Sequence, residues 1–210
     1  MERKLFQTSE LELKSKAESL AKKILITDSR LVESYGVQEQ KRAADLFDEF
    51  TEIQDRYSSL EKEVSDRIES FVKTKDVKRK TLQANFLQGD RMTLEDAVQK
   101  IDSFLARLEK PEQNLQVYIL AGEIRAAQIE ELIKKGTDFL PEQLRSQEGM
   151  IYLNRCRNAF SDRITSLKTT YMTCLQYKAS SGLEKENLCS HLETINGILQ
   201  ELIPLEKISD

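Results

Sequence analysis

The stretch that decides the fold runs from residue 150 to residue 174 and reads MIYLNRCRNAFSDRITSLKTTYMTC. Its apolar residues recur at alternating spacings of three and four, the period of one face of an α-helix that packs on another helix. The stripe consists of Met150, Leu153, Arg157, Phe160, Ile164, Leu167, Tyr171 and Cys174, with Arg157 as its one charged member. This pattern predicts a long helix that buries one face against neighbouring helices.

Two further stretches carry the same pattern. The apolar residues of 46–64 alternate spacings of four and three and predict a helix over about residues 38–73. Another stripe, over 94–133, predicts a helix over about residues 93–135. Pro111 lies inside it, and proline removes a backbone donor and clashes with the preceding turn. This stretch is therefore either one kinked helix or two helices that meet at Pro111.

Residues that interrupt helices mark the expected ends of these elements. A first helix is expected to begin at Ser9, because Ser9 and Glu12 form a capping-box pattern. The other expected interruptions are the loosening of this helix at Tyr35-Gly36, a connection over 75–91 with a turn at Gly89-Asp90, the connection from Gly136 to Gln147, a break at Ser180-Ser181-Gly182, and the end of the last helix before Pro204.

The composition favours helices over a sheet. The chain of 210 residues has seven glycines and three prolines, which are too few turn-forming residues for many short strands. No stretch alternates apolar and polar residues for long enough to suggest a strand. Since amphipathic helices must bury their stripes against each other, we expect an all-α fold of elongated antiparallel three-helix bundles.

Residues 89–175 also resemble a spectrin repeat. The turn before the second helix of the repeat corresponds to Gly89-Asp90. The second helix then begins with Leu94-Glu95-Asp96-Ala97-Val98 and closes over Ile129 to Gly136. The apolar spacing of the third helix is matched by Ile151 to Arg155, Phe160 and Ile164 to Leu167. The resemblance implies a three-helix bundle at 61–180, with its first helix between Glu61 and Leu87. Helices of a partial or flanking bundle at 1–60 precede it, and a C-terminal helix at 181–210 either packs on the bundle or starts a further repeat. The family's usual tryptophan is missing, with Phe71 the nearest substitute, as in divergent repeats of plakins and nuclear-envelope linker proteins.

The residues that usually carry catalysis or bind metals are sparse. His191 is the single histidine, and with Cys189 it supplies too few ligands for a tetrahedral zinc site. Cys156 lies beside the apolar stripe and Cys174 lies on it, and Cys174 is interpreted as a small apolar core residue. Neither GxGxxG nor GxxxxGK occurs, which argues against a phosphate-binding loop. We therefore expect no catalytic, cofactor-binding or metal site, and no enzyme.

Charge supplies the candidate interaction residues. The net charge of −4 argues against general nucleic-acid binding, and no apolar run is long enough for a transmembrane helix. Against this acidic background, five basic residues fall close together: Lys73, Lys75, Lys78, Arg79 and Lys80. This run could contact an anionic membrane, an acidic partner segment or a transport receptor, or be a solvated connection between helices. Arg157 is the sixth candidate, because it is a charged residue within the apolar stripe. Three interpretations are open: its side chain reaches the bundle surface, it pairs with a carboxylate of a neighbouring helix, or it marks a face left open for a partner.

Together these patterns predict a non-enzymatic protein-interaction scaffold or spacer of a cytoskeletal, organelle-tethering or motor-adaptor protein. Other proteins are the expected partners, while self-association and peripheral membrane contact stay open. Two alternatives remain: a BAR-like membrane-shaping dimer, and a subunit of a coiled-coil complex such as a kinetochore or tethering assembly. Three cysteines without CxxC spacing and a polar start of the chain favour a cytoplasmic location, with cytoskeletal or organelle association.

Overall fold

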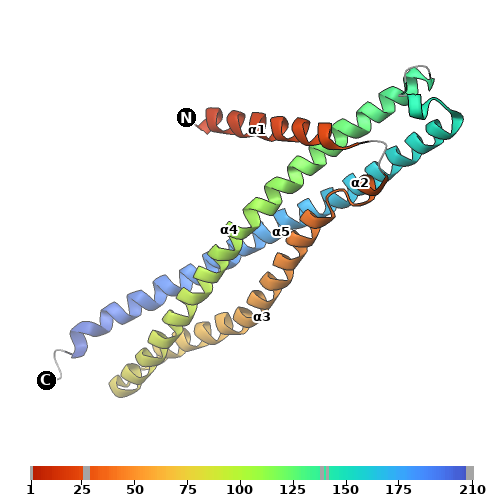
Figure 1. Ribbon diagram of the computed structural model, residues 1–210. Coiled ribbons are helices and arrows are strands. Elements are labelled where there is room, and N and C mark those ends of the chain that lie inside the picture. Colours follow the sequence, from red (N-terminus) through yellow and green to blue (C-terminus); the bar gives the residue numbers. More distant parts are fainter. Residues whose placement is uncertain (1, 26–28, 138–139, 141, 207–210) are drawn as a thin grey trace. The chain divides into compact units, whose positions relative to one another are not determined.

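The computed structural model describes residues 2–25, 29–137, 140 and 142–206, with side chains over 10–25, 30–137, 140, 142 and 144–200. All regular elements in this part of the chain are helices (Figure 1). They are α1 (Glu2–Lys23), α2 (Ser29–Glu33), α3 (Val37–Lys73), α4 (Val77–Lys135), the 3-10 helix η2 (Glu142–Leu144) and α5 (Gln147–Glu206). The predicted all-α class is confirmed.

Packing divides the chain into two compact units. Unit 1 comprises residues 1–44 and 109–175, and unit 2 comprises residues 45–108 and 176–210. Each unit joins stretches that are distant in sequence, because α3, α4 and α5 each contribute residues to both units. The division predicted from the sequence was instead into three consecutive segments, 1–60, 61–180 and 181–210.

The core of unit 1 is formed around Tyr35, which follows α2. Its ring lies 5.3 Å from that of Tyr118 on α4 and 5.5 Å from that of Phe160 on α5, measured between centroids. Its hydroxyl donates a hydrogen bond to the Tyr118 carbonyl, and Arg163 of α5 donates to the Tyr35 carbonyl at 2.8 Å. Gly36, with φ of 71°, then lets the chain turn into α3.

The core of unit 2 is formed by α3, α4 and α5 around Phe50. This fully buried ring lies 4.6 Å from the ring of Phe104 on α4 and 5.7 Å from that of Tyr177 on α5. Other buried apolar residues extend the core on all three helices: Tyr57, Val64, Leu87, Leu94, Ile101, Leu108, Leu188 and Ile195.

Polar pairs show that α3 and α4 run antiparallel in unit 2. Arg67 pairs with Asp90, Tyr57 donates to Asp96 at 3.0 Å and Arg107 pairs with Glu49, so the residue number falls on α3 as it rises on α4. Asp90 is buried, and that burial raises its pKa although the positive charge of Arg67 opposes the shift.

Several predicted helices and ends are confirmed. The prediction of a helix over 38–73 corresponds to α3, and the stretch over 93–135 is part of one helix that continues through Pro111, so the two-helix alternative is wrong. Gly136 closes α4 with φ of 84°, and the connection to α5 follows it as expected.

The turn predicted at Gly89-Asp90 is wrong, because α4 begins at Val77 and runs through both residues. One helical glycine costs about 1 kcal/mol relative to alanine. On either side of it Leu87 and Leu94 are completely buried, and burying one leucine contributes about 1.5–3 kcal/mol. The real turn is Thr74–Asp76, so the proposed first helix of a spectrin repeat does not lie between Glu61 and Leu87 as one element.

The break predicted at Ser180-Ser181-Gly182 is also wrong, since α5 continues through it. Ser181 is buried, and its hydroxyl donates to the carbonyl of Tyr177 at 2.6 Å, so the helix satisfies this polar group internally. The helix also continues past Pro204 to Glu206. At the other end of the chain, α1 begins at Glu2 instead of Ser9 and ends at Lys23, well before Tyr35.

Candidate functional site: the basic tip of the α3–α4 hairpin

Five of the six predicted site residues lie together where α3 turns into α4 in unit 2. Lys73 ends α3, Lys75 lies in the connection, and the other three are in the first turn of α4. Asp76 caps α4, because its Oδ1 accepts hydrogen bonds from the backbone N–H groups of Lys78 at 2.9 Å and Arg79 at 3.2 Å. The cap holds the backbone at the start of α4, which carries these two cationic side chains.

The five cations differ in what they contact. Lys73 pairs with Glu69 one turn earlier on α3, and this hydrogen bond holds the pKa of the Glu69 carboxyl below its ordinary value. The ammonium of Lys80 lies 5.4 Å from the centre of the Phe71 ring. Among the described residues, Lys75, Lys78 and Arg79 have no carboxylate within 4.0 Å. Their charges are therefore available to a partner.

Large apolar side chains that are close to these cations in sequence are also exposed to solvent. The exposed fractions are 69% for Val72, 67% for Val77, 58% for Leu82 and 56% for Phe86. Leu82 and Phe86 are four residues apart and so share one helix face. We call the set formed by Val72, Lys75, Val77, Lys78, Arg79, Leu82 and Phe86 the tip surface.

The sequence pattern did not reveal the apolar half of the tip surface. The expected turn at Gly89-Asp90 places the residues before it in a connection between helices. In such a connection Leu82 and Phe86 do not share a helix face. The signal was available in the absence of any acidic residue from Val77 to Gly89 and in the spacing of these two apolar residues.

Arg157, the sixth predicted residue, belongs to unit 1. Its guanidinium donates to the side-chain oxygen of Asn158 at 3.2 Å and is not part of any ion pair within the described residues. It lines a groove of 450 Å³ together with Glu123, Glu130 and Lys168, of which Lys168 pairs with Glu123 at 2.7 Å. The pKa of Glu130 is lowered mainly by its hydrogen bond with Lys134 and, more weakly, by the charge of Arg157.

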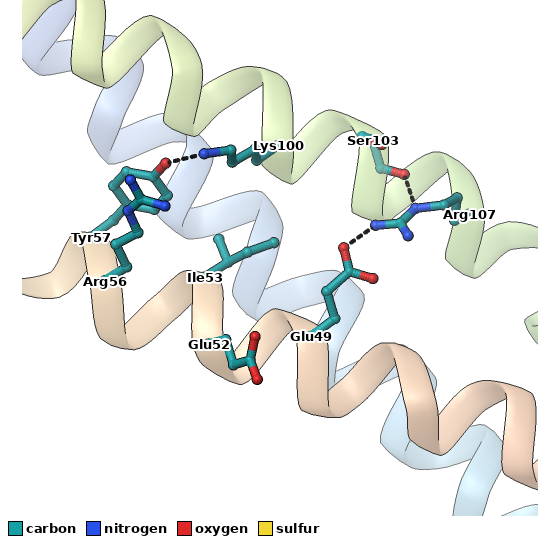
Figure 2. Close-up of a pocket in the computed structure, with 8 residues that line it drawn as sticks. All are labelled: Glu49, Glu52, Ile53, Arg56, Tyr57, Lys100, Ser103 and Arg107. Carbon is teal, nitrogen blue, oxygen red and sulfur yellow. Dashed lines mark hydrogen bonds and ion pairs between the residues drawn. The ribbon is translucent and has the colours of Figure 1, made fainter.

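A second groove, of 440 Å³, lies between α3 and α4 in unit 2 (Figure 2). It is lined by Glu49, Glu52, Ile53, Arg56, Tyr57, Lys100, Ser103 and Arg107. Arg107 pairs with Glu49 across the groove, while Lys100 donates to the Tyr57 hydroxyl at 3.0 Å. Figure 2 shows Ile53 between these two polar contacts.

This groove is suited to polar recognition, and its lysine is a poor base or nucleophile. The hydrogen bond from Lys100 to Asp96, and then the one to Tyr57, raise the pKa of the Lys100 ammonium above its ordinary value. A lysine that acts as base or nucleophile needs the opposite shift. The groove therefore offers fixed charges of both signs to a partner.

Within the part of the chain that the structure describes, no three His, Cys, Asp or Glu side chains are grouped to hold a metal ion. His191 lies 3.7 Å from Glu61 in unit 2, and Cys174 is buried, which raises the pKa of its thiol to about 11. None of the helices, as far as they are described, is both long and apolar enough to cross a membrane.

Comparison with protein-family models, with curated proteins and with solved structures finds no match to this chain. The resemblance to a spectrin repeat is therefore a resemblance of sequence pattern, with no matching family, protein or structure beside it.

Proposed function

We propose that this chain is a non-enzymatic scaffold or spacer that holds partner proteins through exposed helix faces. The observation that carries the proposal is the continuity of three helices, which are 37, 59 and 60 residues long and each contribute to two separately packed cores. A helix keeps the distance between its ends because every residue adds a fixed rise of about 1.5 Å. Long helices shared between cores suit a protein whose task is to set a distance.

The charged surfaces of these helices support the part of the proposal that concerns partners. The α3–α4 groove presents Arg56, Lys100 and Arg107 beside two glutamates, an arrangement that can pair with side chains of a partner helix. Such contacts at a partly exposed surface give selectivity more than affinity. We therefore expect partner binding through these faces to weaken as ionic strength rises.

We further propose that the fold belongs to the spectrin-like class of three-helix bundles. Unit 2 supports this proposal: α3 and α4 are joined by three residues, and both share a core with α5 around Phe50. The likeness then starts at α3, earlier than the sequence suggested. Cytoskeletal, tethering or motor-adaptor context, and a cytoplasmic location, are parts of the same proposal.

Small-angle X-ray scattering tests the spacer proposal directly. A compact chain of 210 residues has a radius of gyration of about 17 Å, and we expect a clearly larger value. Light scattering on the same sample gives the mass to compare with 24.3 kDa for one chain, which separates an extended monomer from a dimer. A monomer with a radius of gyration near 17 Å would contradict the proposal.

A further inference from the structure

We propose that the tip surface of the α3–α4 hairpin binds anionic phospholipid membranes, so that this end of unit 2 is a peripheral membrane contact. This inference is independent of the spacer proposal, because it depends on side chains at the tip and not on the length of the helices.

Exposed apolar side chains are concentrated at and near the tip surface and are not spread evenly along the chain. Thirteen large apolar side chains are exposed among the described residues, and five of them fall within residues 72–92. Isolated exposed apolar residues are normal, but an apolar group bordered by polar residues marks a binding surface. Here the border consists of cations.

The charge at the tip is the reverse of the charge of the whole chain. Residues 73–89 contain the five cations and only one carboxylate, Asp76, while the chain carries a net charge of −4. Asp76 is occupied as the cap of α4. The cations Lys75, Lys78 and Arg79 therefore face solvent without a neutralising partner within the described residues, in a chain that anionic membranes would otherwise repel.

The position of the apolar residues relative to the cations matches a membrane interface. Leu82 and Phe86 share the exposed face of α4 with Lys78 and Arg79, because residues three, four and seven apart lie on the same side of a helix. Val72 and Val77 flank the connection between the helices. Apolar side chains can then enter the boundary between headgroups and acyl chains, while the longer basic side chains reach the phosphates.

The side chains of the tip surface favour a membrane over an acidic protein segment as the partner. An acidic peptide could pair with the cations, but its carboxylates offer nothing to the exposed apolar side chains of Val77, Leu82 and Phe86. A phospholipid bilayer offers both anionic headgroups for the cations and an apolar layer for these side chains.

Vesicle flotation with the full chain tests this proposal. The vesicles contain phosphatidylcholine alone or phosphatidylcholine with phosphatidylserine, at two salt concentrations. We expect binding only to the phosphatidylserine vesicles, and weaker binding at the higher salt because screening shortens the reach of the charges. Binding of equal strength to both kinds of vesicle, or to neither, would overturn the proposal.

Two variants assign the binding to the tip. K75Q/K78Q/R79Q removes three surface cations that an anionic membrane attracts, so its partition coefficient should fall about 100-fold. L82Q/F86Q keeps the charge and should lower binding at least about tenfold, because it removes the inserting apolar groups.

Matched controls separate the tip from net charge and from misfolding. K14Q/K16Q/K22Q removes three exposed cations from α1, and M172Q/L183Q removes two exposed apolar side chains from α5. Both controls should bind as the original chain does, and all four variants should keep its helical circular dichroism and melting temperature. If the controls lose as much binding as the tip variants, or a folded tip variant loses none, the tip is not the membrane contact.

Discussion

Replacing Gly149 by alanine should destabilise unit 1, although alanine usually strengthens a helix. Gly149 lies in the first turn of α5, where its N–H donates to the hydroxyl of Ser146 at 3.0 Å. A Cβ built there would lie 2.2 Å from the carbonyl oxygen of Leu144 and 2.7 Å from its Cα. Ordinary contacts begin at about 3.4 Å, so the helix start or the backbone of η2 must move by about 1 Å.

Two opposing contributions determine how much G149A changes the free energy of unfolding. Overpacking of this kind costs about 1–3 kcal/mol, and Leu144 cannot retreat easily because it is itself buried. Alanine in place of glycine recovers up to about 1 kcal/mol of helix stability. Because the contact is with backbone and is as short as 2.2 Å, we expect an overpacking cost in the upper part of its range, about 2–3 kcal/mol, so that G149A lowers the free energy of unfolding by about 1–2 kcal/mol.

Gly197 provides a matched control in the same helix. It lies in unit 2, and a Cβ at this position meets nothing within 4 Å. G197A should therefore keep only the favourable term and stabilise the protein by about 0.5–1 kcal/mol.

Urea unfolding followed by circular dichroism at 222 nm, at matched protein concentration, measures both variants. The two units can unfold in separate transitions, so the midpoint of each transition is compared with that of the original chain. If G149A is as stable as G197A, the close approach of Leu144 to the start of α5 does not exist in solution. A folded G149A with unchanged transitions would refute the reasoning equally.

Three further predictions concern the interior of the two units. F50A should cost about 3–5 kcal/mol in the transition of unit 2, measured by urea unfolding, because it removes a completely buried ring from the core. E184Q should stabilise unit 2 at pH 7: burial and the charge of Glu61 raise the pKa of Glu184, so the folded state disfavours its ionised form. The original chain regains this stability as the pH falls through the raised pKa, so the difference between the two melting temperatures should shrink toward pH 4, and a constant difference would contradict the assignment. Finally, Cys174 should react with a thiol reagent at pH 8 much more slowly than the less buried Cys189, because a thiol pKa of about 11 leaves only about one thiolate in a thousand, and urea should remove the difference.

The long helices could be predicted from the sequence because burial defines them. In α3 the expected stripe includes Phe50, Tyr57 and Val64, and all three are buried in the structure. When an apolar stripe persists over five or more turns, each buried residue stabilises the packed helix. A single unfavourable residue therefore does not interrupt the helix. Pro111 is such an exception, and α4 passes through it.

The helix ends were harder to predict because they depend on single residues. Gly89 and Ser181 each disfavour a helix by an amount smaller than the burial of one core leucine of the same helix, such as Leu94 or Leu188, so the helix continues. The short connection at 74–76 has no glycine or proline, and its strongest signal is the capping aspartate Asp76. Misplacing this one turn hid the apolar half of the tip surface, although the basic half was recognised.

Which helices share a core could not be read from the sequence at all. Every stripe has the same period and a similar composition, so any one can pair with any other. The selective contacts are polar and distant in sequence, such as the amide of Gln40 donating to Ser166 at 2.8 Å and Thr170 at 3.0 Å. These residues have no recognisable pattern before the helices are placed together.

The interleaved make-up of the two units has a consequence for biosynthesis and for dissection of the protein. Residues 1–44 cannot complete their unit until residue 175 has left the ribosome, and residues 45–108 must wait for the segment after it. Neither unit can therefore be completed from one continuous stretch of the emerging chain. For the same reason a cut between residues 108 and 109 leaves both pieces without part of their cores, and such fragments should recover structure only when they are mixed.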